Sequence, residues 1–166
     1  MDCVIIHRNS LNDINFYVNT QKYIPIDILN DDVWKPLHPA YPHGNIPIPF
    51  FEHEKAVSVE GVWEALKLFE TCGVDDSKLY ITDMKNIRRT EEYYGNYLGH
   101  RVGSSILTYD EAYDQIYKKL YNQVLETTAK DTFLKLKKLN ETHSLLLIDD
   151  TNKYLYTSIL KANLND

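Results

Sequence analysis

One glutamate in this sequence stands where its carboxylate could act on a substrate. Glu60 follows Ser58, a residue type that caps helices, and opens the run EGVWEALKLFE. The backbone N–H groups of a first helical turn stabilise a carboxylate there. In a walled pocket such a carboxylate can hold a water molecule or stabilise an oxocarbenium-like centre during glycosidic cleavage. The alternative is a glutamate that only serves the helix dipole.

Cationic residues gather in the stretch KNIRRTEEYYGNYLGHR, which ends at position 101. The residues that would bind an anion there are Arg88, Arg89, His100 and Arg101. The whole chain carries a net charge of −6, and binding along a duplex needs positive charge to neutralise phosphates. A local cationic cluster on an acidic protein therefore favours a small ligand, a phosphate-bearing nucleotide or nucleoside. The alternative is a solvated helix face on which Glu91 and Glu92 are neighbours.

The sequence contains no zinc-ligand pair, glycine-rich phosphate loop or nucleophile elbow. Of the six histidines, His38 and His43 share a proline-rich stretch, but no set has the spacing of metal ligands on one element. Cys3 and Cys72 lie far apart and predict reduced thiols rather than a disulfide framework. We therefore expect neither a metal nor a cofactor.

Length and composition predict one globular domain. The chain has 166 residues, of which 43% are hydrophobic and 25% charged. We expect a single α+β domain spanning residues 1–166, mainly helical and with a small β-sheet. No apolar run is long enough to cross a membrane and the start lacks the pattern of a secretion signal, so we expect a cytoplasmic protein. The thirteen tyrosines, with frequent Asn, Ile, Lys and Asp, are typical of AT-rich genomes such as those of some bacteriophages.

Hydrophobic spacing and capping residues predict five helices. The first runs from a cap at Ser58 to about Cys72, with Val59, Val62, Leu66 and Phe69 buried. The others cover Ile87 to Tyr97, the segment after Thr108 with Glu111 completing a capping box, Lys130 to Leu139, and Tyr156 to Leu164.

Short apolar runs predict the strands. Val4 to Ile6 and Ile14 to Val18 flank turn-forming residues and predict a hairpin. Leu145 to Ile148 predicts a buried strand, followed by a turn at Asp149 and Asp150. Pro36 to Pro49 predicts a rigid loop, because proline excludes helix interiors and central strands.

The segment GNIPIPFFEHEKAVSVEGVWEALK resembles the pattern of the NADAR family, Ser-Val-Glu-His-x-Tyr-Gln-x-x-Lys after an aromatic and proline-containing lead. The matching residues are Ser58, Val59, Glu60 and Lys67, with Trp63 and Glu64 near the aromatic and glutamine positions. The resemblance is remote and extends from about Pro36 to Asp150. The chain departs from the pattern at Gly61, where the family has histidine, and it lacks the Trp-Gly that follows the family's closing acidic residue.

The resemblance implies an enzyme that hydrolyses the N-glycosidic bond of an ADP-ribosyl or related nucleotide or nucleobase substrate. It implies Glu60 as a catalytic residue, and Asp149 (or Asp150) as a second, late acidic residue. It also makes ADP-ribosylated nucleic acid a candidate partner. The residues that would bind substrate are Lys67, Trp63 and Tyr41, with Arg88, Arg89, His100 and Arg101 holding a pyrophosphate.

Two alternatives stay open. A non-catalytic protein that binds a nucleotide or a host protein would keep the cationic residues but would not depend on Glu60. A DNA glycosylase for a modified base would need a broader positive surface than this acidic chain offers. A role in phage–host conflict fits the enzyme and the binding protein equally. The exact substrate and the oligomeric state stay open.

Overall fold

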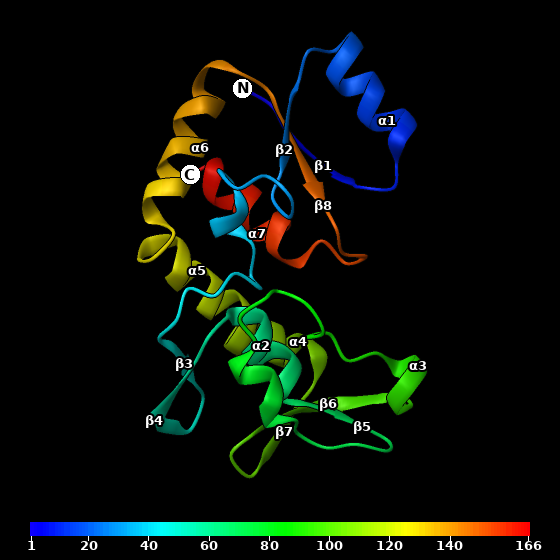
Figure 1. The fold of residues 1–166 in the computed structure, drawn as a ribbon, viewed down its shortest axis with the longest axis vertical. Helices are drawn as coiled ribbons and strands as arrows, with labels where there is room; N and C mark the ends of the chain where they lie inside the picture. Colours follow the sequence, from blue (N-terminus) through cyan, green and yellow to red (C-terminus); the bar gives the residue numbers. More distant parts are fainter. The chain divides into compact units, whose positions relative to one another are not determined.

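The computed structural model describes all residues from Met1 to Asp166 and has an α+β fold, as the sequence predicts. Helices make up 42% of the chain and strands 21%, in three small sheets (Figure 1). The chain divides into two compact units. The first unit combines Met1–His38 with Leu125–Asp166, and the second is the continuous segment Pro39–Val124.

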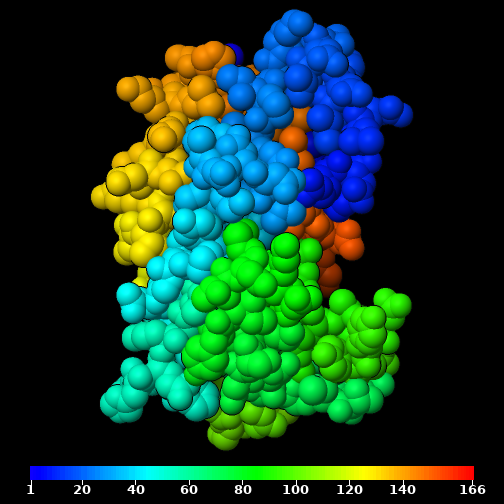
Figure 2. All heavy atoms as spheres, viewed as in Figure 1, coloured from blue at the N-terminus to red at the C-terminus, as the bar shows by residue number.

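The first unit is built on a parallel sheet in the order β1-β8-β2. The strands are β1 (Cys3–His7), β2 (Ile24–Asp27) and β8 (Leu145–Asp149). Leu145 lies opposite both Cys3 and Ile24, so β8 is the central strand. Leu145, Leu146 and Leu147 are fully buried, which is typical of a central parallel strand. In Figure 2 the blue and orange segments, from the two ends of the chain, lie beside each other in this unit.

Helices and turns complete the first unit. They are α1 (Leu11–Asn15), the π-helical turn η1 (Phe16–Thr20), the 3-10 turn η2 (Lys35–Leu37), α6 (Lys130–Thr142) and α7 (Leu155–Leu164). The predicted last strand and the last two predicted helices are thus confirmed, with α6 three residues longer than expected. Phe133 and Leu136 of α6 are buried, and Leu139 is partly exposed.

The predicted N-terminal hairpin is wrong. Ile14 to Val18 lie in α1 and η1, and β1 pairs with β8 instead. The partner of β1 is β8, which lies about 140 residues further along the chain, so local sequence patterns do not indicate the pairing.

The second unit contains two antiparallel sheets. One pairs β3 (Ile46–Ile48) with β4 (Phe51–Ala56), and the other has β5 (Lys67–Phe69), β6 (Tyr97–Val102) and β7 (Ser105–Leu107) in the order β5-β6-β7. The helices and helical turns are α2 (Val59–Ala65), η3 (Asp76–Tyr80), α3 (Glu91–Tyr94), α4 (Tyr109–Ala112), η4 (Tyr113–Tyr117) and α5 (Lys118–Glu126), whose last two residues are assigned to the first unit.

The helix predicted after Thr108 is confirmed and runs on through α4, η4 and α5. The Thr108 side chain accepts from the Glu111 N–H, and the Glu111 carboxylate accepts from the Thr108 N–H, which is the predicted capping box. One face of this helical segment is buried, and its residues recur at helical spacing, namely Ala112, Ile116, Tyr117, Leu120, Tyr121 and Val124.

Helix α2 is shorter than predicted. It ends at Ala65, and the chain continues at once into β5 instead of remaining helical to Cys72. The Leu66 carbonyl accepts from the Arg101 N–H at 2.9 Å, and the Ala65 carbonyl accepts from the Asp75 N–H at 2.9 Å. These distant donors take the carbonyls that another helical turn would need, so tertiary bonding ends the helix.

The helix predicted over Ile87 to Tyr97 is also largely wrong. Only Glu91–Tyr94 is helical, and Tyr97 already belongs to strand β6. Gly95 stops the helix with a φ of +83°, a conformation that favours glycine. Strand β6 then pairs with both β5 and β7.

Candidate functional site

Helix α2 carries two buried carboxylates, Glu60 and Glu64, which we call the acidic pair. The predicted cap is confirmed, because the Ser58 hydroxyl accepts from the Gly61 N–H at 2.9 Å. The Glu60 N–H donates to the Pro39 carbonyl at 2.9 Å, which fixes the first turn further. All seven residues of α2 are buried. The four-residue spacing places both carboxylates on the same face of the helix.

Glycine at position 61 is required by close packing. A Cβ atom on Gly61 would lie 2.6 Å from the Lys78 carbonyl oxygen in η3. Any larger side chain would push α2 away from that turn. The departure from the histidine of the NADAR pattern therefore has a packing reason in this chain.

Glu60 faces an arginine that solvent can reach. Its carboxylate oxygen Oε1 lies 3.3 Å from Arg88 Nε. The Glu60 side chain is 10% exposed, and the Arg88 side chain is 45% exposed. Arg88 thus connects a nearly buried carboxylate with the surface.

Glu64 is held by two donors. Lys67 Nζ lies 2.8 Å from its Oε2, and the Arg89 backbone N–H donates to its Oε1 at 2.7 Å. Burial raises the pKa of Glu64, and the charge of Glu60 acts in the same direction, whereas Lys67 and the Arg89 N–H oppose the rise. The Lys67 ammonium and the Arg89 N–H together hold the Glu64 carboxylate in one position, and the ion pair with Glu64 in turn orients Lys67.

Aromatic rings pack behind the acidic pair. The Trp63 ring centroid lies 4.0 Å from that of His100, 5.3 Å from Tyr117 and 5.6 Å from Tyr109. Lys67 Nζ stands 5.9 Å from the Trp63 centroid, within the range of a cation–π contact. Burial raises the pKa of Tyr109 to about 12, so its hydroxyl stays protonated near neutral pH.

The sequence predicts that His100 helps to bind an anion as a cation, but the structure makes it a buried, neutral residue. The side chain is fully buried, and burial lowers its pKa to about 3, with Lys67 adding to the effect. Its Nε2 lies 2.9 Å from the Trp63 carbonyl, which can only accept, so Nε2 carries the proton. The neutral Nδ1 then accepts from the Tyr97 hydroxyl at 2.7 Å. His100 is a neutral link between α2 and β6.

Arg89 is likewise buried, whereas the sequence predicts that it binds an anion. Its guanidinium donates to the carbonyls of Glu64 at 3.0 Å, Lys67 at 2.8 Å and Gly73, and to Cys72 Sγ at 3.3 Å. Its flat faces contact the Phe69 and Tyr94 rings, with centroids 4.9 and 5.3 Å from Cζ. The Arg89 guanidinium therefore donates to main-chain carbonyls at the end of α2, and its burial leaves it little surface for a ligand.

The other predicted site residues lie apart from the acidic pair. Arg101 is exposed on β6, opposite Ile106. The half-buried Tyr41 ring packs on His43, with centroids 4.9 Å apart. Neither side chain makes a hydrogen bond or ion pair with Glu60 or Glu64. Of the predicted set, the structure brings together Glu60, Trp63, Lys67 and Arg88.

Asp149 belongs to the first unit, at the end of β8. It is fully buried, and its carboxylate accepts from the Thr151 N–H and hydroxyl, each at 2.6 Å, and from the Thr157 hydroxyl. The neighbouring Asp150 accepts from Tyr156 at 3.0 Å and lies 3.1 Å from His38 Nε2. Asp149 therefore fixes the turn between β8 and α7, which gives it a structural role in addition to the catalytic one expected of it.

Sequence reasoning did not select Glu64 as a site residue. A signal for Glu64 is present in the sequence, because Glu60, Glu64 and Lys67 follow one another at helical spacing on one face.

The structure contains no group of three or more His, Cys, Asp or Glu side chains that could hold a metal ion. No helix combines the length and the apolar character needed to cross a membrane.

Fold and site together define an α+β protein with a buried acidic pair flanked by one lysine and one arginine. The chain belongs to DUF6939, a family of unknown function, whose model matches residues 7–160. That match covers both units. No curated protein matches the sequence.

Proposed function

We propose that this protein is an N-glycosidase that hydrolyses the N-glycosidic bond of an ADP-ribosyl or related nucleotide substrate. The observation that carries the proposal is the Glu60–Arg88 pair, a nearly buried carboxylate 3.3 Å from a guanidinium that remains 45% exposed. A carboxylate in such a setting can act on a ribosyl centre while the exposed arginine binds the attached phosphate.

The chemistry assigns each group a different task. In hydrolysis the bond between C1′ and nitrogen breaks with its electron pair going to nitrogen, and a water oxygen forms the new bond to C1′. Glu60 stabilises the cationic ribosyl centre and accepts the proton that the water loses, while the leaving nitrogen gains a proton from solvent. Arg88 and Lys67 complement the negative charge of a diphosphate. Glu64 positions Lys67 through their 2.8 Å contact.

The resemblance to the NADAR pattern supports the same residues. Its matching positions Ser58, Val59, Glu60 and Lys67 include the cap of α2, one carboxylate of the acidic pair and the lysine that pairs with the other. The proposed place of action is the cytoplasm, which is the host cytoplasm if a phage encodes the protein.

Hydrolysis by purified protein tests the proposal. The substrates are ADP-ribosylated guanosine, NAD and unmodified guanosine, and product release is followed by chromatography. We expect Glu60→Gln to keep the melting temperature and lose most of the turnover, because glutamine retains shape but not charge. The matched control is Glu92→Gln, which changes an exposed carboxylate on α3 and should leave the rate unchanged. Equal rates for Glu60→Gln and the parent protein would refute a mechanism centred on Glu60.

A non-catalytic nucleotide-binding protein is the second candidate. The observation that favours it is that both carboxylates of the acidic pair already accept from protein donors, Arg88 for Glu60 and Lys67 with Arg89 for Glu64. Under this alternative the parent protein releases no product from any substrate. ADP-ribose would still raise its melting temperature, by mass action, and Arg88→Ala would abolish that increase.

A further inference from the structure

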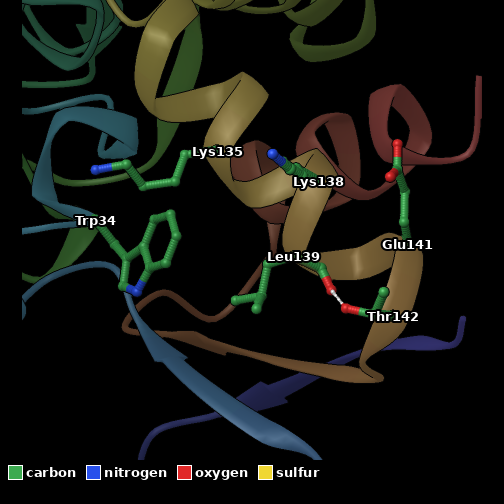
Figure 3. A pocket seen from close by; sticks show the side chains of 6 residues that line it. All are labelled: Trp34, Lys135, Lys138, Leu139, Glu141 and Thr142. Carbon is green, nitrogen blue, oxygen red and sulfur yellow. Dashed lines mark hydrogen bonds between the residues drawn. The ribbon is translucent and has the colours of Figure 1, made fainter.

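A second candidate binding site lies in the first unit, between the turn η2 and helix α6. It is a pocket of about 460 Å³ that opens to solvent, within the usual size range of small-molecule sites. Six residues line it, namely Trp34, Lys135, Lys138, Leu139, Glu141 and Thr142 (Figure 3). None of them belongs to the acidic pair or its partners, which lie in the second unit.

The wall of the pocket is mainly apolar. Trp34 lies just before η2 and is 9% exposed, so most of its indole is fixed by packing. Figure 3 shows Leu139 between Trp34 on one side and Thr142 on the other. A rigid indole next to an aliphatic side chain forms a surface on which a planar ring can stack.

The two lysines of the pocket differ from neighbouring lysines in their bonding. Lys137 donates to the Asp166 carbonyl at 2.8 Å, and Lys35 pairs with Asp32 at 3.1 Å. Lys135 and Lys138 make no hydrogen bond or ion pair with the protein. Their three-residue spacing on α6 puts both amino groups on one face of the helix. Two unpaired cations beside an apolar wall are complementary to an anionic group attached to a ring.

The far end of the pocket offers a hydrogen-bond acceptor. Glu141 is exposed and has no partner in the protein, and Figure 3 shows it on the opposite side from Lys135 and Trp34. The Thr142 hydroxyl is already bonded to the Leu139 carbonyl and to His143. A ligand with a donor group at one end and an anion at the other matches this distribution of charge.

We propose that this pocket binds a planar aromatic anion of the size of a nucleoside monophosphate. The ring stacks beside Trp34 and Leu139, the anionic group lies between Lys135 and Lys138, and an amino group of the ring donates to Glu141. This site is independent of the acidic pair, so the protein has two places at which a nucleotide-like ligand binds.

Calorimetric titration with AMP tests the proposal, because AMP combines a planar base that carries an amino group with a single phosphate. Adenosine and inorganic phosphate are titrated separately to divide the two contributions. We expect saturable binding of AMP, and binding of adenosine or phosphate at least about tenfold weaker, a difference of roughly 1.4 kcal/mol. The double variant Lys135→Ala/Lys138→Ala should lose the same factor.

Two further variants distinguish this site from the acidic pair. Lys118→Ala/Lys119→Ala removes two exposed lysines of α5 and should leave the affinity for AMP unchanged. Arg88→Ala removes the exposed cation beside Glu60 and reports on any AMP that binds there. If Arg88→Ala abolishes AMP binding while the Lys135/Lys138 variant retains it, AMP binds at Glu60 and the pocket proposal is wrong. Absence of saturable AMP binding, or equal affinity for adenosine and AMP, would also overturn it.

Discussion

Glu64 and Arg89 bind each other twice. The Glu64 carboxylate accepts from the Arg89 backbone N–H at 2.7 Å, and the Arg89 guanidinium donates to the Glu64 carbonyl at 3.0 Å. The two residues are 25 positions apart in sequence. This reciprocal pair fixes the segment before α3 against the end of α2, and it thereby sets the position of Arg88 next to Glu60.

Replacement of Arg89 by lysine should destabilise the protein strongly. A lysine amino group cannot serve the carbonyls of Glu64, Lys67 and Gly73 together, so buried acceptors lose their donors. We expect a loss of about 2–4 kcal/mol in the free energy of unfolding, measured by urea denaturation. Arg101→Lys is the control and should stay within about 0.5 kcal/mol of the parent, because that side chain is exposed and makes no ion pair. Similar losses for both variants would contradict the structural role of Arg89.

Two glycine substitutions test the packing of α2. A Cβ at Gly61 meets the Lys78 carbonyl at 2.6 Å, whereas a Cβ at Gly73 meets nothing within 4 Å. We expect Gly61→Ala to cost about 1–3 kcal/mol as an overpacked position, and Gly73→Ala to be close to neutral. Thermal denaturation followed by circular dichroism compares them. A stable Gly61→His variant would show that the histidine of the NADAR pattern fits here after all.

His100 should make stability depend on pH. Its pKa is about 3 in the folded protein against an ordinary value of 6.5, so the unfolded chain binds the proton more readily. Its contribution to stability is therefore fully present above pH 6.5 and is lost as the pH falls toward 3. Inside that window the loss approaches roughly 1.4 kcal/mol per pH unit.

The control for this titration is His100→Gln. Glutamine keeps a donor and an acceptor for the Trp63 carbonyl and the Tyr97 hydroxyl but does not titrate. The free energy of unfolding of the variant should fall less steeply between pH 6.5 and 4 than that of the parent. Parallel curves for the two proteins would mean that His100 is not held neutral.

Removal of the Arg88 side chain should affect function more than stability. Because the guanidinium is 45% exposed, its ion pair with Glu60 should contribute no more than about 1 kcal/mol to folding. If Arg88 binds a substrate phosphate, Arg88→Ala should raise KM at least about tenfold with a smaller change in kcat. A variant that loses stability heavily but keeps KM would instead make the pair structural.

Local signals explain where the sequence predicted the fold well. Thr108 and Glu111 cap their own helix, and Ser58 caps α2, so both starts are visible within a few residues. The end of α2 depends on donors from Asp75, Arg89 and Arg101, which lie further along the chain, and propensity alone extends the helix too far. The parallel pairing of β1 with β8 likewise joins segments far apart in the sequence, so local patterns do not predict it.

The candidate site shows the same division. Helical spacing predicts Glu60, Trp63 and Lys67 on one helix. In the structure Lys67 belongs to β5, but its Nζ still lies 5.9 Å from the centroid of the Trp63 ring. The sequence predicts Arg89 and His100 as anion-binding residues because both side chains can carry a positive charge. Both side chains are buried instead: the Arg89 guanidinium donates to main-chain carbonyls, and His100 remains neutral.

The place of β8 in the first unit has a consequence for biosynthesis. Strands β1 and β2 pair only with β8, so a growing chain cannot close this sheet until Leu145–Asp149 has left the ribosome. The segment Pro39–Val124 emerges earlier and holds all the strands of its own two sheets. Until β8 has emerged, strands β1 and β2 expose unpaired edges of the kind that chaperones shield and other chains can capture.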